Sequence, residues 1–343
     1  MIGGASPSLL NVGWSVPRSL EAALCGGMGL QGERLGPQTQ RTLAAFDDLW
    51  NAFVAHIDHG AELGARICAA NLRVQQHDTP FLLASLLIDD CLERGRGVVQ
   101  GGARYIGSCI MAHGFSNAAD SLTAIRKLAY ETAGVDLDTI RAALRDNFKD
   151  NEALRRRLAA APKFGNDDPD ADEMLARMWR EISARSDAAG KRHGLGFFTV
   201  SSVNPGGYHM GAVCGATADG RLAGKPFAIG NAPTAGADTN GITALLNSIR
   251  KVDPANGGAT TNIKLAKSMF VQNRPKLEAL FGSFWASGGM QATMTVINQA
   301  DLQDALAHPD RYPNLLVRLG GWTARFVELS PEIQQEIVRR TVY

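Results

Sequence analysis

The residues of this 343-residue chain best suited to chemistry are its cysteines, its histidines and one pair of adjacent glycines. A thiolate can act as a nucleophile or bind a metal ion. The five cysteines are scattered and form no CxxC pair, so the sequence indicates neither a disulfide framework nor a zinc site. Free thiols of this kind fit a reducing cytoplasm. The cysteines are Cys25, Cys68, Cys91, Cys109 and Cys214.

Two of the seven histidines, His56 and His59, are close enough in sequence to share one face of a helix. Such a pair could bind a metal ion if a third ligand lay on the same face. Glu62 and Asp58 are the nearest carboxylates, but their spacing turns them away from His56. A solvated helix face therefore explains the pair better, and no metal site is predicted.

Other signatures point away from several common functions. No GxGxxG, GK[ST] or GxSxG motif occurs, so nucleotide binding by these loops and hydrolase chemistry are not indicated. The net charge is +1 and 45% of the residues are hydrophobic, as in ordinary globular proteins. The arginine run 155–157 is short and surrounded by acids. We expect no nucleic-acid partner and, because no long apolar run occurs, no membrane span.

Hydrophobic periodicity predicts a first half made mainly of helices. The segment 79–93 is apolar on nearly all sides, so we expect one buried helix that ends at Gly95. The first seventeen residues look like a loop, with no opening strand before the first helix. The predicted helices cover 18–24, 38–76, 79–93, 119–132, 136–148, 151–160 and 170–185.

The second half contains more glycine and alternates strands with helices. An adjacent Gly320–Gly321 pair predicts a tight turn, and Ser330-Pro331-Glu332 predicts a helix start. Predicted strands or extended segments cover 195–203, 260–265, 290–298, 314–319 and 323–329, and predicted helices cover 242–250, 275–285 and 301–308.

The segment Arg318-Leu319-Gly320-Gly321-Trp322 resembles the signature of the glycyl radical enzymes, the pyruvate formate-lyase family. That signature is an arginine, a small aliphatic residue, a small residue, a glycine and an aromatic residue. Segments 30–39, 81–95, 215–249 and 288–298 also resemble this family and follow its order. The resemblance implies an α/β fold: half of a ten-stranded α/β barrel wrapped by helices, with a C-terminal glycyl radical loop. It implies a barrel part at 1–213 and a glycine radical domain at 214–343.

The resemblance implies Gly321 as the residue that stores the radical. A radical on a backbone Cα is delocalised over the flanking amide and carbonyl when the centre is planar, and a Cβ would crowd that arrangement. The alternatives are that Gly321 is a turn glycine, or that Gly320 is the radical site. Arg318, Gly320, Trp322 and Ala324 are expected to support the loop. Leu319 and Trp322 depart from the family's usual β-branched residue and tyrosine.

A stored radical needs a cysteine thiol that passes the hydrogen atom to it, and in the family this cysteine precedes the helix that resembles 16–27. No cysteine lies before Val16, so we expect it on an N-terminal Cys-loop half or subunit. The chain is then the C-terminal part of an enzyme, as a fragment or split subunit. The alternative is a non-catalytic or spare-part protein that completes a partner chain. Cys25 is read as incidental, and Cys68 and Cys91 as buried small hydrophobes.

The implied chemistry is hydrogen-atom abstraction from a small organic substrate, followed by C–C, C–O or C–N cleavage or by acetyl transfer of the formate C-acetyltransferase type. A separate activating enzyme that uses S-adenosylmethionine and an iron–sulfur cluster would install the radical, and no cofactor would be bound by this chain. Anaerobic metabolism in the cytoplasm is expected, and a homodimer is left open. Five residues on segments that resemble barrel strands are candidates for the pocket: Tyr105, Cys109, His209, Gln291 and Asn298.

Overall fold

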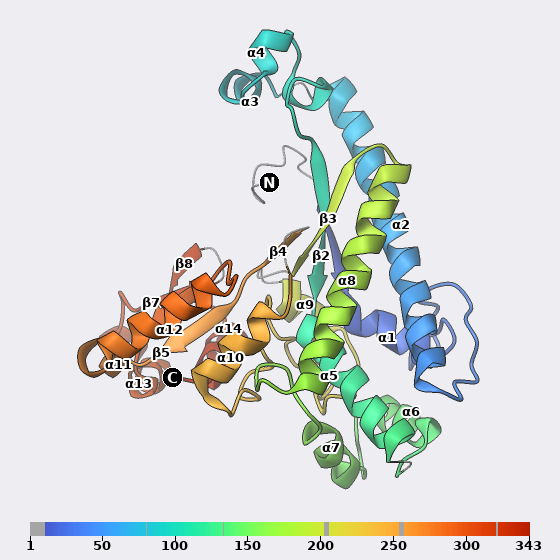
Figure 1. The fold of residues 1–343 in the computed structure, drawn as a ribbon, viewed down its shortest axis with the longest axis vertical. Coiled ribbons are helices and arrows are strands. Elements are labelled where there is room, and N and C mark those ends of the chain that lie inside the picture. The colour runs from blue at the N-terminus through green and yellow to red at the C-terminus, as the bar shows by residue number, and fades with distance from the viewer. Residues whose placement is uncertain (1–10, 80, 133, 202–205, 254–256, 320–321) are drawn as a thin grey trace.

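The computed structural model describes residues 11–79, 81–132, 134–201, 206–253, 257–319 and 322–343 (Figure 1). Its first sheet has four parallel strands in the order β1 (Val12–Ser15), β2 (Gly107–His113), β3 (Gly196–Ser201) and β4 (Gly257–Ala259). Parallel strands need long crossovers, and here helices supply them. The predicted α/β class is confirmed.

Two long helices, α2 (Phe46–Asp78) and α8 (Pro169–Arg192), cover one face of this sheet (Figure 1). The backbone of α8 lies so close to β3 that a Cβ at Gly190 would be 2.6 Å from the Phe197 Cβ. Only glycine permits this approach. Phe197 is buried between the two helices together with Ile110 of β2. This face of the sheet is therefore part of the hydrophobic core.

A second group of helices packs below the sheet around α5, in which every residue is buried. Its contact with α8 includes Phe115 and Trp179, whose ring centroids are 5.2 Å apart. A π-helical turn, Arg126–Glu131, continues α5. The helices of this group are α1 (Val16–Leu24), α5 (Phe115–Ile125), α6 (Leu137–Arg145) and α7 (Glu152–Ala159).

The C-terminal part contains two further sheets on the other side of the first sheet (Figure 1). β5 (Asn262–Leu265) and β6 (Thr293–Val296) are parallel, whereas β7 (Leu316–Leu319) and β8 (Trp322–Arg325) are antiparallel. The accompanying helices are α10 (Gly241–Arg250), α11 (Lys267–Gln272), α12 (Arg274–Ala286), α13 (Gln299–Ala307) and α14 (Pro331–Arg339).

The prediction of one buried helix over 79–93 is wrong. The segment forms two short helices, α3 (Leu82–Leu87) and α4 (Cys91–Arg94). The first of them ends before Ile88, whose backbone is extended, and Asp90, just before the second, has a left-handed φ of 71° that cannot continue a right-handed helix. Leu83 and Leu87 are 72% and 77% exposed, because no described residue covers them. The apolar composition of this segment therefore did not show whether another part of the chain would cover it.

Five α-helices and strands were not predicted from the sequence. β1 is the opening strand that the sequence was expected to lack, and β2, β4, α9 (Gly206–Ala212) and α11 also fall outside the predicted elements. The β2 sequence GSCIMAH is buried on both faces, so it shows no alternation of polar and apolar residues. Among the described helices none is long and apolar enough to cross a membrane.

Candidate active site

The predicted radical loop lies between the ends of an antiparallel strand pair. Leu319, the last residue of β7, pairs with Trp322, the first residue of β8. Only Gly320 and Gly321 separate them in sequence, and both lie outside the described residues. At the other end, the Phe326 amide donates to the Leu315 carbonyl at 2.7 Å. The described residues on both sides of the glycine pair are therefore held in fixed register.

An apolar cluster of its own fixes this strand pair. Val317 and Leu319 are 1% and 4% exposed, whereas Leu316, which points to the other face of the strand, is 58% exposed. This is the alternation of a strand with one buried face. Leu319, which departs from the family signature, fills the cluster with its side chain. The other buried members of the cluster are Ile297, Leu302, Ala305, Phe326 and Ile337.

Hydrogen bonds join β7 to its neighbours on two sides. The Arg318 amide donates to Thr295 Oγ1 of β6 at 3.0 Å, and the Arg318 guanidinium donates to Thr323 Oγ1 of β8 at 2.8 Å. Ala324 is partly buried against the apolar cluster, and Trp322 is 43% exposed. The structure thus brings Arg318, Trp322 and Ala324 together on one strand pair.

The face of the first sheet that α2 and α8 leave uncovered carries the second set of candidate groups. Side chains alternate along β2, and Ile110 points to α2, so Cys109, Met111 and His113 lie on the opposite face. Burial raises the pKa of the Cys109 thiol to about 12, which keeps the thiol protonated at neutral pH. In a barrel, this uncovered face is the one that lines the interior.

His113 is a candidate that the sequence did not single out. It ends β2, is 2% exposed, and its Nδ1 has no hydrogen-bond partner among the described residues. A Cβ at Gly13 of β1 or at Gly207 of α9 would lie 3.9 Å from its ring nitrogens. Burial lowers the pKa of His113 to about 4, so the ring is neutral. A prediction of β2 would have placed it on the same face as Cys109.

The other predicted pocket residues lie in varied surroundings. Tyr105 is 69% exposed, and His209 is exposed on α9. Gln291 connects β6 to the residue before β5, because its Oε1 accepts from the Thr261 amide at 2.9 Å and its amide donates to Thr293. Asn298 accepts from the Lys267 amide at 3.3 Å at the start of α13. The described residues do not bring these four side chains into one cluster with Cys109.

The remaining cysteines are separated from the strand pair. No cysteine occurs after Cys214 in the sequence, so β5 to β8 contain none. Cys68, Cys91 and Cys214 are buried, and Cys25 is half-buried. Burial raises the pKa of Cys68 and of Cys214. The thiols of Cys68 and Cys214 are therefore protonated at neutral pH, and their surroundings are those of core residues.

The expectation of a solvated face for His56 and His59 is wrong for His56. That side chain is 4% exposed, and its Nε2 is 3.3 Å from Thr39 Oγ1, whereas His59 is exposed. Burial lowers the pKa of His56. Within the described ranges, no group of three metal-ligating side chains comes together.

Comparison with known proteins agrees with this arrangement of a helix-covered parallel sheet and a C-terminal strand pair. Residues 1–207 match the family described as pyruvate formate lyase-like, and residues 227–327 match the family described as glycine radical. The fold and the signature are thus those of the glycyl radical enzymes. This chain belongs to the pyruvate formate lyase-like family of those enzymes.

Several relatives are similar along nearly the whole chain. The probable dehydratase YbiW of Escherichia coli is 32% identical over 94% of this chain, and the trans-4-hydroxy-L-proline dehydratase of Clostridioides difficile is 30% identical over 95%. The chain spans 42% of the length of each.

Solved structures show the same fold. The B12-independent glycerol dehydratase from Clostridium butyricum superposes with a TM-score of 0.92 at 27% identity. A glycyl radical enzyme from Archaeoglobus fulgidus superposes with a TM-score of 0.90 at 32% identity. Each match covers 96% of this chain and 43% of the other chain. The fold of this chain is therefore that of the corresponding part of the pyruvate formate-lyase-like barrel.

Proposed function

We propose that this chain supplies one barrel half and the radical domain of a glycyl radical enzyme, and that Gly321 stores the radical. The observation that carries this proposal is the pairing of Leu319 with Trp322, which leaves only Gly320 and Gly321 between two anchored strands. Gly321 occupies the glycine position of the family signature. A glycyl radical is stabilised when its Cα is planar, and glycine has no Cβ to oppose planarity.

The thiol that exchanges a hydrogen atom with Gly321 comes, in this proposal, from the part of the family fold that this chain does not contain. The glycyl radical takes the hydrogen atom of that thiol and leaves a thiyl radical. The thiyl radical then takes a hydrogen atom from a substrate C–H bond, and the product radical later takes one back. The core-like surroundings of Cys68, Cys91 and Cys214 support an external thiol. Activation is assigned to a separate S-adenosylmethionine and iron–sulfur enzyme.

Elimination of water from a small hydroxylated substrate is the reaction that the relatives favour. Two similar relatives are named as dehydratases, and two similar solved structures, with TM-scores of 0.92 and 0.91, are a glycerol dehydratase and one titled for 1,2-propanediol dehydration. Acetyl transfer of the formate type has no counterpart among these relatives. On the uncovered face of the sheet, the neutral ring of His113 is suited to hold a substrate hydroxyl.

The two parts of the chain are assigned to 1–213 and 214–343. The boundary falls in the stretch between the two family matches, which end at residue 207 and resume at residue 227. A spare-part protein would need little more than the radical domain. The match over the barrel part therefore favours an enzyme half, whose partners are the Cys-loop half, an activating enzyme and a small-molecule substrate.

Reconstitution tests this function directly. The full chain is combined anaerobically with a polypeptide that carries the Cys-loop half and with an activating enzyme, and is offered glycerol, 1,2-propanediol and trans-4-hydroxy-L-proline. Mass spectrometry should detect the loss of one water from at least one of them. Gly321→Ala should abolish turnover, with Gly320→Ala as the matched control. Equal turnover by Gly321→Ala would refute the role of Gly321, and turnover with no dehydrated product would refute the reaction class.

A further inference from the structure

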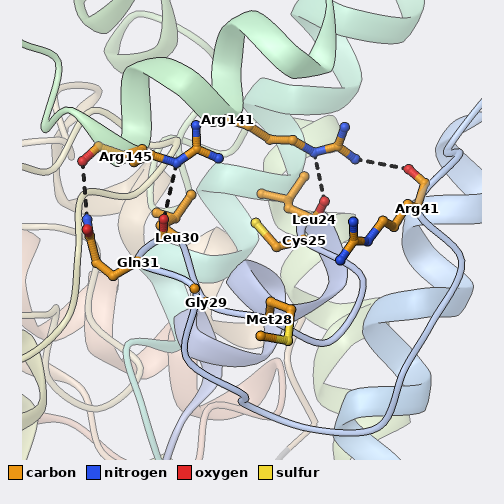
Figure 2. Close-up of a pocket in the computed structure, with 10 residues that line it drawn as sticks. Leu24, Cys25, Met28, Gly29, Leu30, Gln31, Arg41, Arg141 and Arg145 are labelled. Atoms are coloured by element: carbon orange, nitrogen blue, oxygen red, sulfur yellow. Dashed lines mark hydrogen bonds between the residues drawn. The ribbon is translucent and has the colours of Figure 1, made fainter.

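A pocket of about 560 Å³ lies between the end of α1, the following loop and α6, on the opposite side of the molecule from β7 and β8 (Figures 1 and 2). Three arginines from two separate segments line it: Arg41 from the loop, and Arg141 and Arg145 from α6. Leu24 and Met28 give it an apolar wall. Among the described residues that line it, none is acidic.

Arg141 forms the fixed part of the pocket. Its guanidinium donates to the Leu24 carbonyl at 2.7 Å, to the Arg41 carbonyl at 3.3 Å and to Asp138 at 2.6 Å. These bonds hold α6, the end of α1 and the loop together, as Figure 2 shows for the two carbonyls. The charge of Arg141 is offset by Asp138, so the guanidinium serves mainly as a support.

Arg41 and Arg145 have donors to spare. Arg145 donates from Nε to the Leu30 carbonyl at 3.2 Å, and its two terminal nitrogens have no partner among the described residues. Among the described residues, the Arg41 guanidinium has no hydrogen-bond or ion-pair partner. Both arginines are exposed enough to reach a solute. Guanidinium groups with free donor pairs bind carboxylate or phosphate oxygens in a bidentate manner.

All three guanidinium groups lie close enough to the thiol of Cys25 to affect its pKa. Figure 2 shows Cys25 in the middle of the pocket, with Arg141 above it and Arg41 beside it. All three arginines lower the pKa of Cys25, although burial is the largest effect and raises it overall. The nearby carboxylate of Glu21 opposes the arginines, but it is buried and accepts from the Leu30 amide at 2.8 Å. The lining of the pocket itself carries three arginines and no acidic side chain.

We infer that this pocket binds an anionic small molecule, whose phosphate or carboxylate oxygens accept from Arg41 and Arg145 while its remainder lies against Leu24 and Met28. Nothing in the radical chemistry uses these residues, and they lie on a different part of the fold. The pocket is thus a second binding site, separate from the radical chemistry, and it suits an anionic metabolite that acts as an effector.

Calorimetry with pyrophosphate and with citrate tests the site on the full chain. We expect saturable binding of at least one of them at one site, weakened about ten-fold or more by Arg41→Gln combined with Arg145→Gln. Arg66→Gln, which removes an exposed arginine of α2 that has no partner among the described residues, is the matched control and should leave the affinity unchanged. Equal affinity in the double variant and the wild type, or binding of neither anion, would overturn the proposal.

Cys25 provides an independent readout, because it is the one cysteine of the chain that is not fully buried. The anionic disulfide dithiobis(nitrobenzoate) should react with Cys25 faster than neutral dithiodipyridine does, after correction for their intrinsic reactivities. High salt should remove the difference, because exposed charges are then screened. The bound anion should slow labelling, and Cys25→Ser should eliminate it. A labelling rate that neither anion nor salt changes would contradict the inferred pocket.

Discussion

Leu319 and Trp322 are paired residues at the ends of two antiparallel strands, with only Gly320 and Gly321 between them. The side chain of Leu319 is buried in an apolar cluster, whereas Trp322 is 43% exposed. One side of the glycine pair is therefore anchored in the fold, and the other carries a ring that is free to contact a partner. In the proposed function an activating enzyme has to reach this site, so we expect the exposed ring of Trp322 next to it to be one of the contacts.

Thr295→Val should weaken the attachment of the strand pair to β6. The substitution keeps the shape of the side chain but removes the oxygen that accepts from the Arg318 amide. We expect a loss of about 1 kcal/mol in the free energy of unfolding, measured by urea denaturation of the full chain. Thr323→Val removes a bond to the same arginine at an exposed position and should cost less than about 0.5 kcal/mol. The reverse order of the two losses would contradict the proposed attachment.

Oxygen should cut the activated protein near Gly321, since dioxygen adds to a backbone radical. The released tail, from about Trp322 to Tyr343, should appear only under denaturing conditions. In the folded protein it stays bound, because the Tyr343 amide donates to the Lys264 carbonyl at 3.0 Å and Lys264 Nζ donates to the Ile337 carbonyl at 2.9 Å. Denaturing and native mass spectrometry together check this, and an uncut chain after full activation and air exposure would count against radical storage at Gly321.

Asp120 should make the protein less stable as the pH rises. It is fully buried, and burial raises its pKa to about 8, so the folded state keeps a proton that the unfolded chain loses near pH 4. Its contribution to stability is present below about pH 4 and is lost towards pH 8, by up to about 1.4 kcal/mol per pH unit. Asp120→Asn keeps an oxygen for the Phe164 amide and should remove this dependence. Equal pH slopes for the variant and the wild type would contradict the assignment.

His113 should give the opposite slope in a narrower range. Because burial lowers its pKa to about 4, the unfolded chain binds a proton below about pH 6.5 that the folded chain does not. Its contribution is therefore present above about pH 6.5 and lost as the pH falls towards 4. Urea denaturation at several pH values should show that His113→Gln loses less stability than the wild type over this interval. A parallel loss in both proteins would place His113 in a more polar environment.

The sequence predicted the long helices and most of the C-terminal strands correctly, because these elements depend on the local spacing of apolar residues and on turn residues. The helix expected at 38–76 is present as Phe46–Asp78, and its start is fixed by the Asp48 side chain, which accepts from the Ala45 amide at 2.9 Å. The prediction of one helix at 79–93 was wrong, since the sequence of apolar residues such as Leu83 does not show whether a neighbouring element will cover them.

The candidate site was predicted only in part for a related reason. Arg318, Trp322 and Ala324 follow from a local signature, and the structure places them on one strand pair. His113 depends on β2, a strand buried on both faces, and on its position opposite Gly13 of β1. Such contacts join segments about a hundred residues apart in sequence. A local sequence pattern therefore cannot predict contacts of this kind.

Electron paramagnetic resonance after anaerobic activation tests radical storage at Gly321 most directly. The full chain, combined with its Cys-loop partner and an activating enzyme, should give the doublet of a glycyl radical coupled to its one remaining α-hydrogen. Gly320→Ala should retain the doublet, and Gly321→Ala should lose it. A doublet of undiminished intensity in Gly321→Ala would contradict the account.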